Sequence, residues 1–154
     1  MTIELRPVTA ENWRALIDLK LRDGQSRFVA SNLYSIAESQ FGYEEEGHWN
    51  FYPFGAYVNG EPIGFVMYSF NFGHSRFQAF IMRLMVDEKY QGKGHGREIM
   101  KQVLDSFRTD EHIKNVGISY EPENEVARKL YASLGFEEPG EIIDGETLAV
   151  LNLR

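Results

Sequence analysis

The chain has 154 residues, of which 43% are hydrophobic, so it can bury one substantial core and a single domain over residues 1–154 is expected. Its formal net charge of −7 disfavours nucleic acid as a partner and mildly favours cationic ones. The absence of cysteine excludes disulfides and cysteine nucleophiles, and the four scattered histidines predict no metal site. No apolar stretch reaches membrane-spanning length and the N-terminus has no signal-peptide pattern, so we expect a cytoplasmic protein with no membrane partner.

The first half of the chain predicts a strand, two helices and a hairpin. Residues 3–8 alternate as a strand does, and apolar residues then recur at helical spacing, first behind Thr9 as an N-cap. Asn-Gly between two β-rich runs is a strong hairpin signal. In chain order the expected elements are a strand at 3–8, a helix beginning near Thr9, a helix at 31–40, and strands at 51–58 and 61–72 joined at Asn59-Gly60.

The run QGKGHG at 91–96 follows an apolar strand at 78–87 and opens a helical pattern. Its three glycines can take positive φ and let a ligand approach the backbone closely. The free N–H groups at the start of the next helix attract anionic oxygens, and Lys93 adds a positive charge beside them. This spacing fits neither a Walker loop nor a dinucleotide fingerprint, so the sequence predicts a phosphate-binding turn of another kind.

After this turn, apolar residues from Ile99 to Phe107 predict a helix. A strand at 114–120, a helix at 124–134 and a closing hairpin of 136–143 and 147–153, turning at Asp144-Gly145, complete the chain. The element order is therefore β-α-α-β-β-β-α-β-α-β-β, which predicts a mixed sheet with helices packed on it.

Two motifs follow one another in this order of elements. The first, [RQ]-x-x-G-x-[GA], is matched by Gln91, Gly94 and Gly96. The second, N-x-x-A-x-x-L-Y-x-x-x-G-F, is matched by Asn124, Ala127, Leu130, Tyr131, Gly135 and Phe136. Together they resemble the acetyl-CoA-binding core of the GNAT superfamily of N-acetyltransferases. The resemblance implies an α/β (α+β) fold with a mixed, mostly antiparallel central sheet of about seven strands flanked by four helices, and it implies acetyl-CoA as co-substrate.

The same resemblance assigns roles to individual residues. The pyrophosphate of coenzyme A would lie on the backbone of the turn, at Gln91, Gly92, Lys93, Gly94, His95 and Gly96. Its pantetheine arm would bind the backbone of Leu84, Met85 and Val86, in a splay between two strands, and contact Asn124 and Ala127. Tyr131 would be the general acid that protonates the departing thiolate. Each residue also has a structural alternative: Tyr131, Leu84 and Met85 as core, Asn124 as an N-cap, and Lys93 and His95 as solvated turn residues.

The acceptor half is biased in composition. Residues 28–75 contain no Lys or Arg, five Glu and many aromatic residues, which suits a linear polyamine because carboxylates bind ammonium groups and aromatic faces attract cations. Residues 28–38 and the run YQGKG also resemble bacterial spermidine/spermine or diamine acetyltransferases. We therefore expect a primary amine acceptor, with a polyamine favoured, and contacts from Tyr34, Glu38, Glu45 and Glu121. Other amines (amino acid, aminoglycoside or protein N-terminus) and a non-catalytic CoA-binding module remain alternatives.

The general base is not identified by the sequence. Polyamine acetyltransferases of this superfamily often carry a carboxylate at the position of Met82, and this strand has no acidic residue before Asp87. Glu38, Glu121, His48 and the run at 44–46 are the alternatives.

The C-terminal strand is apolar on both faces and needs cover from helices or from a second subunit, and many relatives dimerise, so a homodimer is expected.

Overall fold

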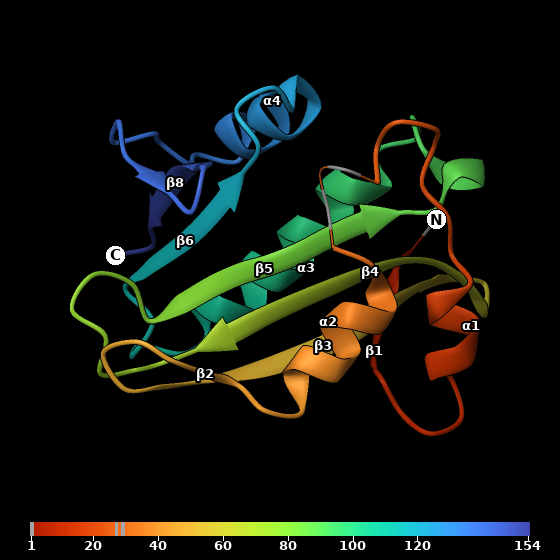
Figure 1. Ribbon diagram of the computed structural model, residues 1–154, viewed down its shortest axis with the longest axis horizontal. Helices are drawn as coiled ribbons and strands as arrows, with labels where there is room; N and C mark the ends of the chain where they lie inside the picture. Colours follow the sequence, from red (N-terminus) through yellow and green to blue (C-terminus); the bar gives the residue numbers. More distant parts are fainter. Residues whose placement is uncertain (1, 27, 29) are drawn as a thin grey trace.

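A mixed sheet forms the centre of the fold (Figure 1), and the computed structural model describes residues 2–26, 28 and 30–154. Its strands run in the order β1-β3-β4-β5-β6-β8-β7, with β2 on β3, and every neighbouring pair is antiparallel except β5 and β6. The mostly antiparallel sheet predicted from the sequence is thereby confirmed. The strands are β1 (Glu4–Pro7), β2 (Tyr43–Glu44), β3 (His48–Val58), β4 (Glu61–Phe70), β5 (Ala79–Val86), β6 (Asn115–Tyr120), β7 (Ile142–Ile143) and β8 (Glu146–Asn152).

Helices cover both faces of this sheet. In Figure 1, α1 and α2 lie in front of the strands, α3 lies behind them, and α4 follows the end of β6. Over the described residues the α-helices are α1 (Trp13–Ile17), α2 (Asn32–Ser39), α3 (His95–Arg108) and α4 (Glu125–Ser133), with a 3-10 helix η1 (Glu88–Tyr90) before the glycine turn. Within the same residues, no helix has both the length and the apolar character that crossing a bilayer requires.

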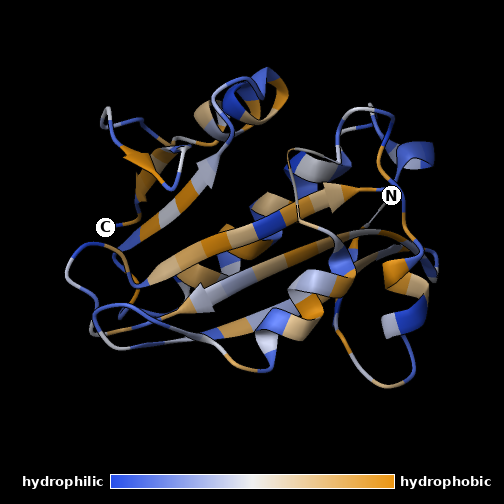
Figure 2. Cartoon of the chain, viewed as in Figure 1, coloured by the Kyte–Doolittle hydropathy of each residue, from blue (hydrophilic) through white to orange (hydrophobic). Residues whose placement is uncertain are grey.

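Two apolar clusters, one on each face, hold the helices to the sheet. On the α3 face, the helix buries the predicted residues Ile99, Met100, Val103, Leu104 and Phe107 against the strands. On the other face, Leu19 and Ile36 pack over a cluster that includes Phe65, Met67 and Met85. Figure 2 shows the result as hydrophobic strands in the centre and hydrophilic loops around them. The α1–α2 face and the α3 face of the sheet therefore carry separate apolar clusters, the α1–α2 cluster and the α3 cluster.

Two predicted boundaries differ most from the structure. Thr9 does not cap α1: its backbone N–H donates to Asn12 Oδ1 (2.8 Å) and its carbonyl accepts from Trp13, so a turn precedes a helix that starts only at Trp13. The closing hairpin is also shorter than predicted, because Pro139 offers no backbone N–H and Gly140 has φ 92°, which interrupts the strand between the Glu137–Val150 bridge and β7. The turn at Asp144-Gly145 is present, with φ 49° and 81°.

Both faces of β8 are covered within one chain. Leu148 is fully buried in the α1–α2 cluster, and Ala149 and Leu151 are buried in the α3 cluster. The homodimer expectation therefore loses the packing argument on which it partly rested, and a homodimer stays a prediction.

The β5–β6 pair is short, and this shapes the site. The two strands pair only from Ala79 to Ile81 and from Val116 to Ile118. Beyond these residues β6 turns away from β5, as Figure 1 shows. Over the described residues, the edge of β5 from Met82 to Val86 faces a gap on its β6 side, where a parallel strand would otherwise supply hydrogen bonds.

Gly64 sets how closely β4 approaches this end of β5. A Cβ at Gly64 would lie 2.7 Å from the Met85 carbonyl oxygen, so Gly64→Ala must push two strands apart. We expect a loss of about 1–3 kcal/mol in the free energy of unfolding, measured by chemical denaturation. Gly73→Ala is the matched control, because its nearest atom would be 3.8 Å away. Equal stability of the two variants would contradict this account of the strand packing.

Candidate functional site

A cleft of about 1010 Å³ lies where β5 and β6 diverge. It runs from the end of β5 to the start of α3 on one side, and along β6 and α4 on the other. With the exception of Lys93, every residue that the sequence assigned to the cofactor lines this cleft: Leu84, Met85, Val86, Gln91, Gly92, Gly94, His95, Gly96, Asn124, Ala127 and Tyr131. The structure thus brings together two motifs that lie about thirty residues apart in the chain.

The glycine turn presents backbone to the cleft. Gly92 and Gly94 have φ 77° and 82°, a left-handed conformation that glycine adopts without strain, and Gly94 is the N-cap of the fourteen-residue helix α3. Gln91 fastens the turn to the end of β5 through a hydrogen bond from its Nε2 to the Val86 carbonyl (2.9 Å). Lys93 points toward the ring of Tyr90, with Nζ 5.8 Å from the ring centroid. The first N–H groups of α3 have no acceptor within the helix, an arrangement that attracts anionic groups.

Asn124 has the capping role that its sequence position predicts as an alternative. It is the N-cap of α4, and its Oδ1 accepts a hydrogen bond from the Ala127 N–H (3.2 Å). It also lines the cleft, so the capping role and contact with a ligand are compatible.

Tyr131 lies on the α3-face side of the cleft and is 7% exposed. The centroid of its ring lies 5.6 Å from that of the Tyr120 ring. Burial is the main cause that raises the pKa of Tyr131, and the neighbouring Tyr120 adds to it. The Tyr120 hydroxyl donates instead to Glu138, and burial together with this hydrogen bond raises the pKa of Tyr120 to about 12. Tyr131 therefore carries its phenolic proton at neutral pH and above.

The opposite side of the cleft, on the α1–α2 face, is formed at a β-bulge. Met67 pairs with Arg83 and Tyr68 with Ile81, so Met82 is an extra residue in β5. As a result the side chains of Met82 and Arg83 both point to the α1–α2 face. Met82 packs in the α1–α2 cluster, and Arg83 donates a hydrogen bond to Glu38 on α2 at 3.3 Å. Arg83 also donates to the Met82 carbonyl, while its Nε is buried and has no hydrogen-bond partner in the described structure. A guanidinium thus lies beside Met82 on the side of the cleft where the sequence offered no carboxylate.

The four residues proposed for the acceptor are not brought together, and none of them is among the described residues that line the cleft. Tyr34 is 59% exposed on α2, and Glu38 reaches the cleft only through its contact with Arg83. Glu121 follows β6, where its carbonyl accepts from the Asn124 N–H. Val29, within the stretch that resembles polyamine acetyltransferases, lies outside the described residues.

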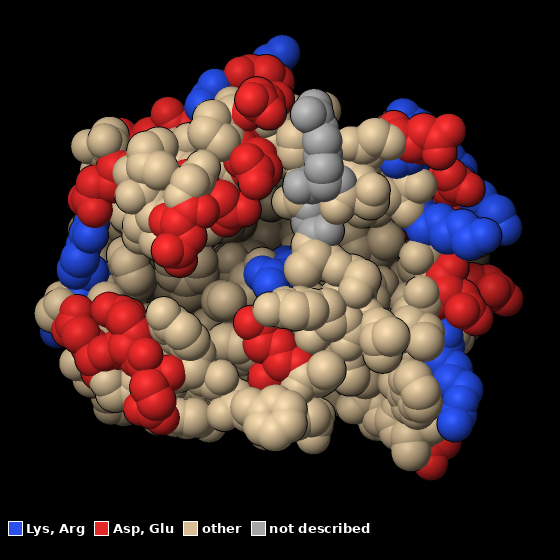
Figure 3. All heavy atoms as spheres, in the orientation of Figure 1, with Lys and Arg blue, Asp and Glu red and all other residues tan. Residues whose placement is uncertain are grey.

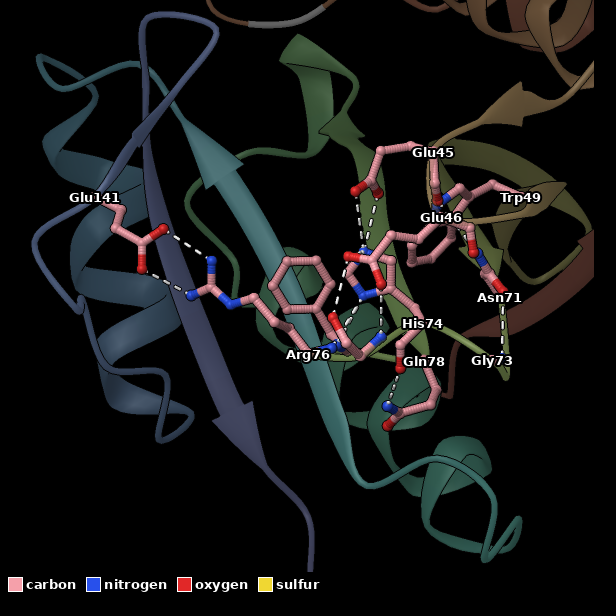
Figure 4. Close-up of polar contacts among 11 residues, drawn as sticks. Glu45, Glu46, Trp49, Asn71, Gly73, His74, Arg76, Gln78 and Glu141 are labelled. Atoms are coloured by element: carbon pink, nitrogen blue, oxygen red, sulfur yellow. Dashed lines mark hydrogen bonds and ion pairs between the residues drawn. The ribbon is translucent and has the colours of Figure 1, made fainter.

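Glu45 lies in a separate polar cluster with Glu46 and His74 (Figure 4). Ligand atoms of these three residues lie within 4.8 Å of one another, a spacing that could suit a metal ion. However, His74 Nδ1 accepts the backbone N–H groups of Arg76 and Phe77 (3.1 and 3.2 Å), so the ring hydrogen is on Nε2 and points at Glu45 (2.9 Å). In this arrangement His74 is a hydrogen-bond donor that ties the β2–β3 hairpin to the β4–β5 loop.

Two acidic residues that the sequence reasoning missed do line the cleft: Asp144 and Glu146, on either side of Gly145 in the β7–β8 turn. Glu146 Oε1 accepts a hydrogen bond from Ser119 Oγ (2.8 Å), which fixes the carboxylate against β6. The Asp-Gly hairpin signal predicted the turn, but only the pairing of β8 with β6 shows that the turn reaches the cleft.

Known proteins resemble this chain in sequence or in fold over nearly its whole length. The spermine/spermidine N(1)-acetyltransferase of Bacillus subtilis (strain 168) is 28% identical over 158 residues, covering 99% of this chain and 100% of that protein. Among solved structures, the aminoglycoside acetyltransferase AAC(6')-Ib in complex with coenzyme A has a TM-score of 0.75 at 20% identity, covering 98% of this chain and 95% of the other. A chimera of the spermidine N-acetyltransferase SpeG from Vibrio cholerae and hSSAT has a TM-score of 0.72 at 20% identity, covering 99% and 96%.

The family model described as "Acetyltransferase (GNAT) family" matches residues 13–136, which include the glycine turn, the divergent strands and α4. The chain therefore belongs to the GNAT family of acetyltransferases and is a coenzyme A-dependent N-acetyltransferase.

Proposed function

We propose that this protein transfers the acetyl group of acetyl-CoA to a primary amine of a polyamine. The observation that carries the choice of acceptor is the acidic border of the cleft on the α1–α2 face. Asp144 and Glu146 lie on one wall, and Glu38 stands behind the other. Figure 3 shows Asp and Glu side chains around a hollow on this face. The relative from Bacillus subtilis, whose name states spermine and spermidine, supports the same class of acceptor.

The cleft fits coenzyme A in two respects. The N–H groups at the start of α3 suit its pyrophosphate, and the unpaired edge of β5 suits the amides of its pantetheine arm, since buried backbone groups need partners. When bound, acetyl-CoA supplies an activated thioester. We assign the turn at 91–96, the end of β5, Asn124 and Ala127 to its binding.

Tyr131 is assigned the role of general acid. It lies on the α3-face side of the cleft, opposite the α1–α2 side where the acidic residues gather, so it can donate its proton to a leaving sulfur while the amine approaches from the other side. The amine must bind in its neutral form or lose a proton in the cleft before it reacts. An alkyl ammonium of pKa near 10.4 is deprotonated in only about one molecule in a few thousand at neutral pH.

One observation favours a second class of acceptor. Arg83 lines the cleft, and its buried Nε has no hydrogen-bond partner among the described residues, so a carboxylate on the acceptor that reached this guanidinium would satisfy it. An amino acid is therefore the second candidate, and Glu38, which already neutralises Arg83, would then stabilise the free enzyme instead of binding the ammonium.

The choice of acceptor is tested by following release of the CoA thiol from acetyl-CoA with a panel of amines. We expect turnover with spermidine and spermine and little with amino acids or aminoglycosides. Turnover with amino acids alone would favour the second candidate. Acetyl-CoA binding without turnover of any amine would mean a non-catalytic CoA-binding module.

Gly96→Ala tests the cofactor site. Gly96 is the second residue of α3, and a Cβ there would meet no protein atom closer than 3.8 Å, so the fold should tolerate it and gain about 0.5–1 kcal/mol of helix stability. The same Cβ would project into the space assigned to the pyrophosphate. Calorimetric titration with coenzyme A should show affinity reduced roughly tenfold or more. Affinity unchanged from that of Gly73→Ala would remove the turn from the binding site.

Tyr131→Phe tests the general acid. We expect kcat to fall by about 10²-fold with unchanged affinity for acetyl-CoA. Tyr120→Phe, which removes the neighbouring phenol bonded to Glu138, should be much less damaging. Because the acid must be protonated and burial raises the pKa of Tyr131 above its ordinary 10.0, kcat should show no descending limb below about pH 10. A descending limb below pH 9 that disappears in Tyr131→Phe would contradict the assignment.

A further inference from the structure

The first residues beyond the paired segment of β5 and β6 face each other across the opening of the cleft. Ile81 and Ile118 form the last pair, so Met82 and Ser119 are the next residues on the two strands. Met82 packs in the α1–α2 cluster. Ser119 alternates along β6 with Ile118 and Tyr120, which belong to the α3 cluster, so its side chain lies on the α1–α2 face with that of Met82.

Ser119 binds the Glu146 carboxylate at the opening of the cleft. Its hydroxyl donates to Glu146 Oε1 at 2.8 Å, and both residues line the cleft. Glu146 is half-buried at the start of β8, two residues before Leu148, which pairs with Ser119. The side chain therefore reaches Ser119 diagonally on the same face of the sheet.

The segment that carries Glu146 is held at both ends. Within β7–β8, Ile143 pairs with Glu146 itself. Just before β7, Glu141 accepts two hydrogen bonds from Arg76 at 2.8 Å each, and its carbonyl accepts from the Leu148 N–H. Figure 4 shows Arg76 reaching across from the β4–β5 loop to Glu141. A carboxylate on a paired strand, oriented by a hydroxyl, has the fixed geometry that proton transfer requires.

We propose that Glu146, oriented by Ser119, is the general base of this enzyme and replaces the strand carboxylate that is missing at Met82. This inference rests on the proposed acetyl transfer. The acceptor ammonium gives one proton to a Glu146 oxygen, and the freed nitrogen lone pair forms the N–C bond to the acetyl carbon as the C–S bond breaks. The sulfur takes the Tyr131 proton, the nitrogen of the new amide returns one to Tyr131, and Glu146 releases its proton to water.

Other charged and titratable groups also face this part of the cleft. Arg83 projects from β5, with Glu38 of α2 bonded to it. Asp144 lies in the β7–β8 turn, Arg22 lies in the segment before α2, and Tyr120 and Tyr131 belong to β6 and α4. Of the acidic groups, Asp144 is the nearest alternative in sequence, but it is exposed at the tip of the turn with φ 49°. Its carboxylate therefore serves as the control.

The experiment measures kcat as a function of pH for Glu146→Gln and Asp144→Asn, with the amine that the wild-type enzyme turns over fastest. Gln keeps the size of Glu and can still bond Ser119, while Asn-Gly keeps the favoured turn. For Glu146→Gln we expect kcat near pH 7 to fall by about 10²-fold. Its kcat should then rise tenfold per pH unit toward the pKa of the amine, because only amine deprotonated by solvent reacts. Asp144 belongs to the acidic border of the cleft, so Asp144→Asn should raise the KM for the amine and leave the pH dependence of kcat as in the wild type.

A Glu146→Gln enzyme whose kcat falls equally at every pH, or whose KM alone rises, would overturn the assignment and leave Glu146 a structural or ammonium-binding residue. Thermal unfolding and acetyl-CoA titration of the same variant distinguish a folding defect from loss of the base. Turnover of an amine other than a polyamine would refute the proposed acceptor and still test Glu146. A wild-type enzyme without turnover of any amine would refute both proposals.

Discussion

The divergence of β5 and β6 is the constraint on which the rest of the structure depends. A parallel pair three residues long joins the two strands, and beyond it each strand has backbone groups that the other cannot satisfy. The cleft exists because of this gap, and the glycine turn, the start of α3 and the N-terminus of α4 all open onto it. The bulge at Met82 adds to the same effect, since it turns two successive side chains toward one face.

The divergence also separates the chemistry of the cleft into two sides. Tyr131 belongs to the apolar cluster on the α3 face, whereas Met82, Ser119 and Leu148 belong to the opposite face. The roles proposed for Tyr131 and Glu146 use this separation, with the proton donor in apolar surroundings and the proton acceptor at the acidic border. The sheet itself keeps them apart, so neither group has to be displaced for the other to act.

Local signals in the sequence predicted most of the fold. Hairpins at Asn59-Gly60 and Asp144-Gly145, the apolar face of α3, and the two motifs around Gly94 and Asn124 are each contained within a few adjacent residues. The two errors are local and lie at the ends of elements. Asn12, not Thr9, is the N-cap of α1, and Pro139 with Gly140 shortens the last hairpin.

The acceptor side was harder to predict, because contacts between distant parts of the chain decide it. Glu45 lies in an acidic run and was expected to contact the cationic acceptor, but its hydrogen-bond partner is His74, 29 residues away. Glu146 carried no motif, and its position depends on the pairing of β8 with β6. Arg83 lies in an apolar strand, and only the bulge explains why a cation there meets Glu38. Contacts between sequence-distant strands place all three residues, and local patterns do not encode such contacts.

The short parallel seam has a consequence for how the chain folds. Strands β3 to β5 are joined by short connections and can form early, as can β6 with the β7–β8 hairpin that follows it. The seam between these two units requires the whole crossover through α3, from Val86 to Asn115, to close first, and loop closure over such a span is slow. The two halves of the molecule therefore meet last at the cleft, where few backbone hydrogen bonds join them, and a ligand that spans the seam would add contacts between them.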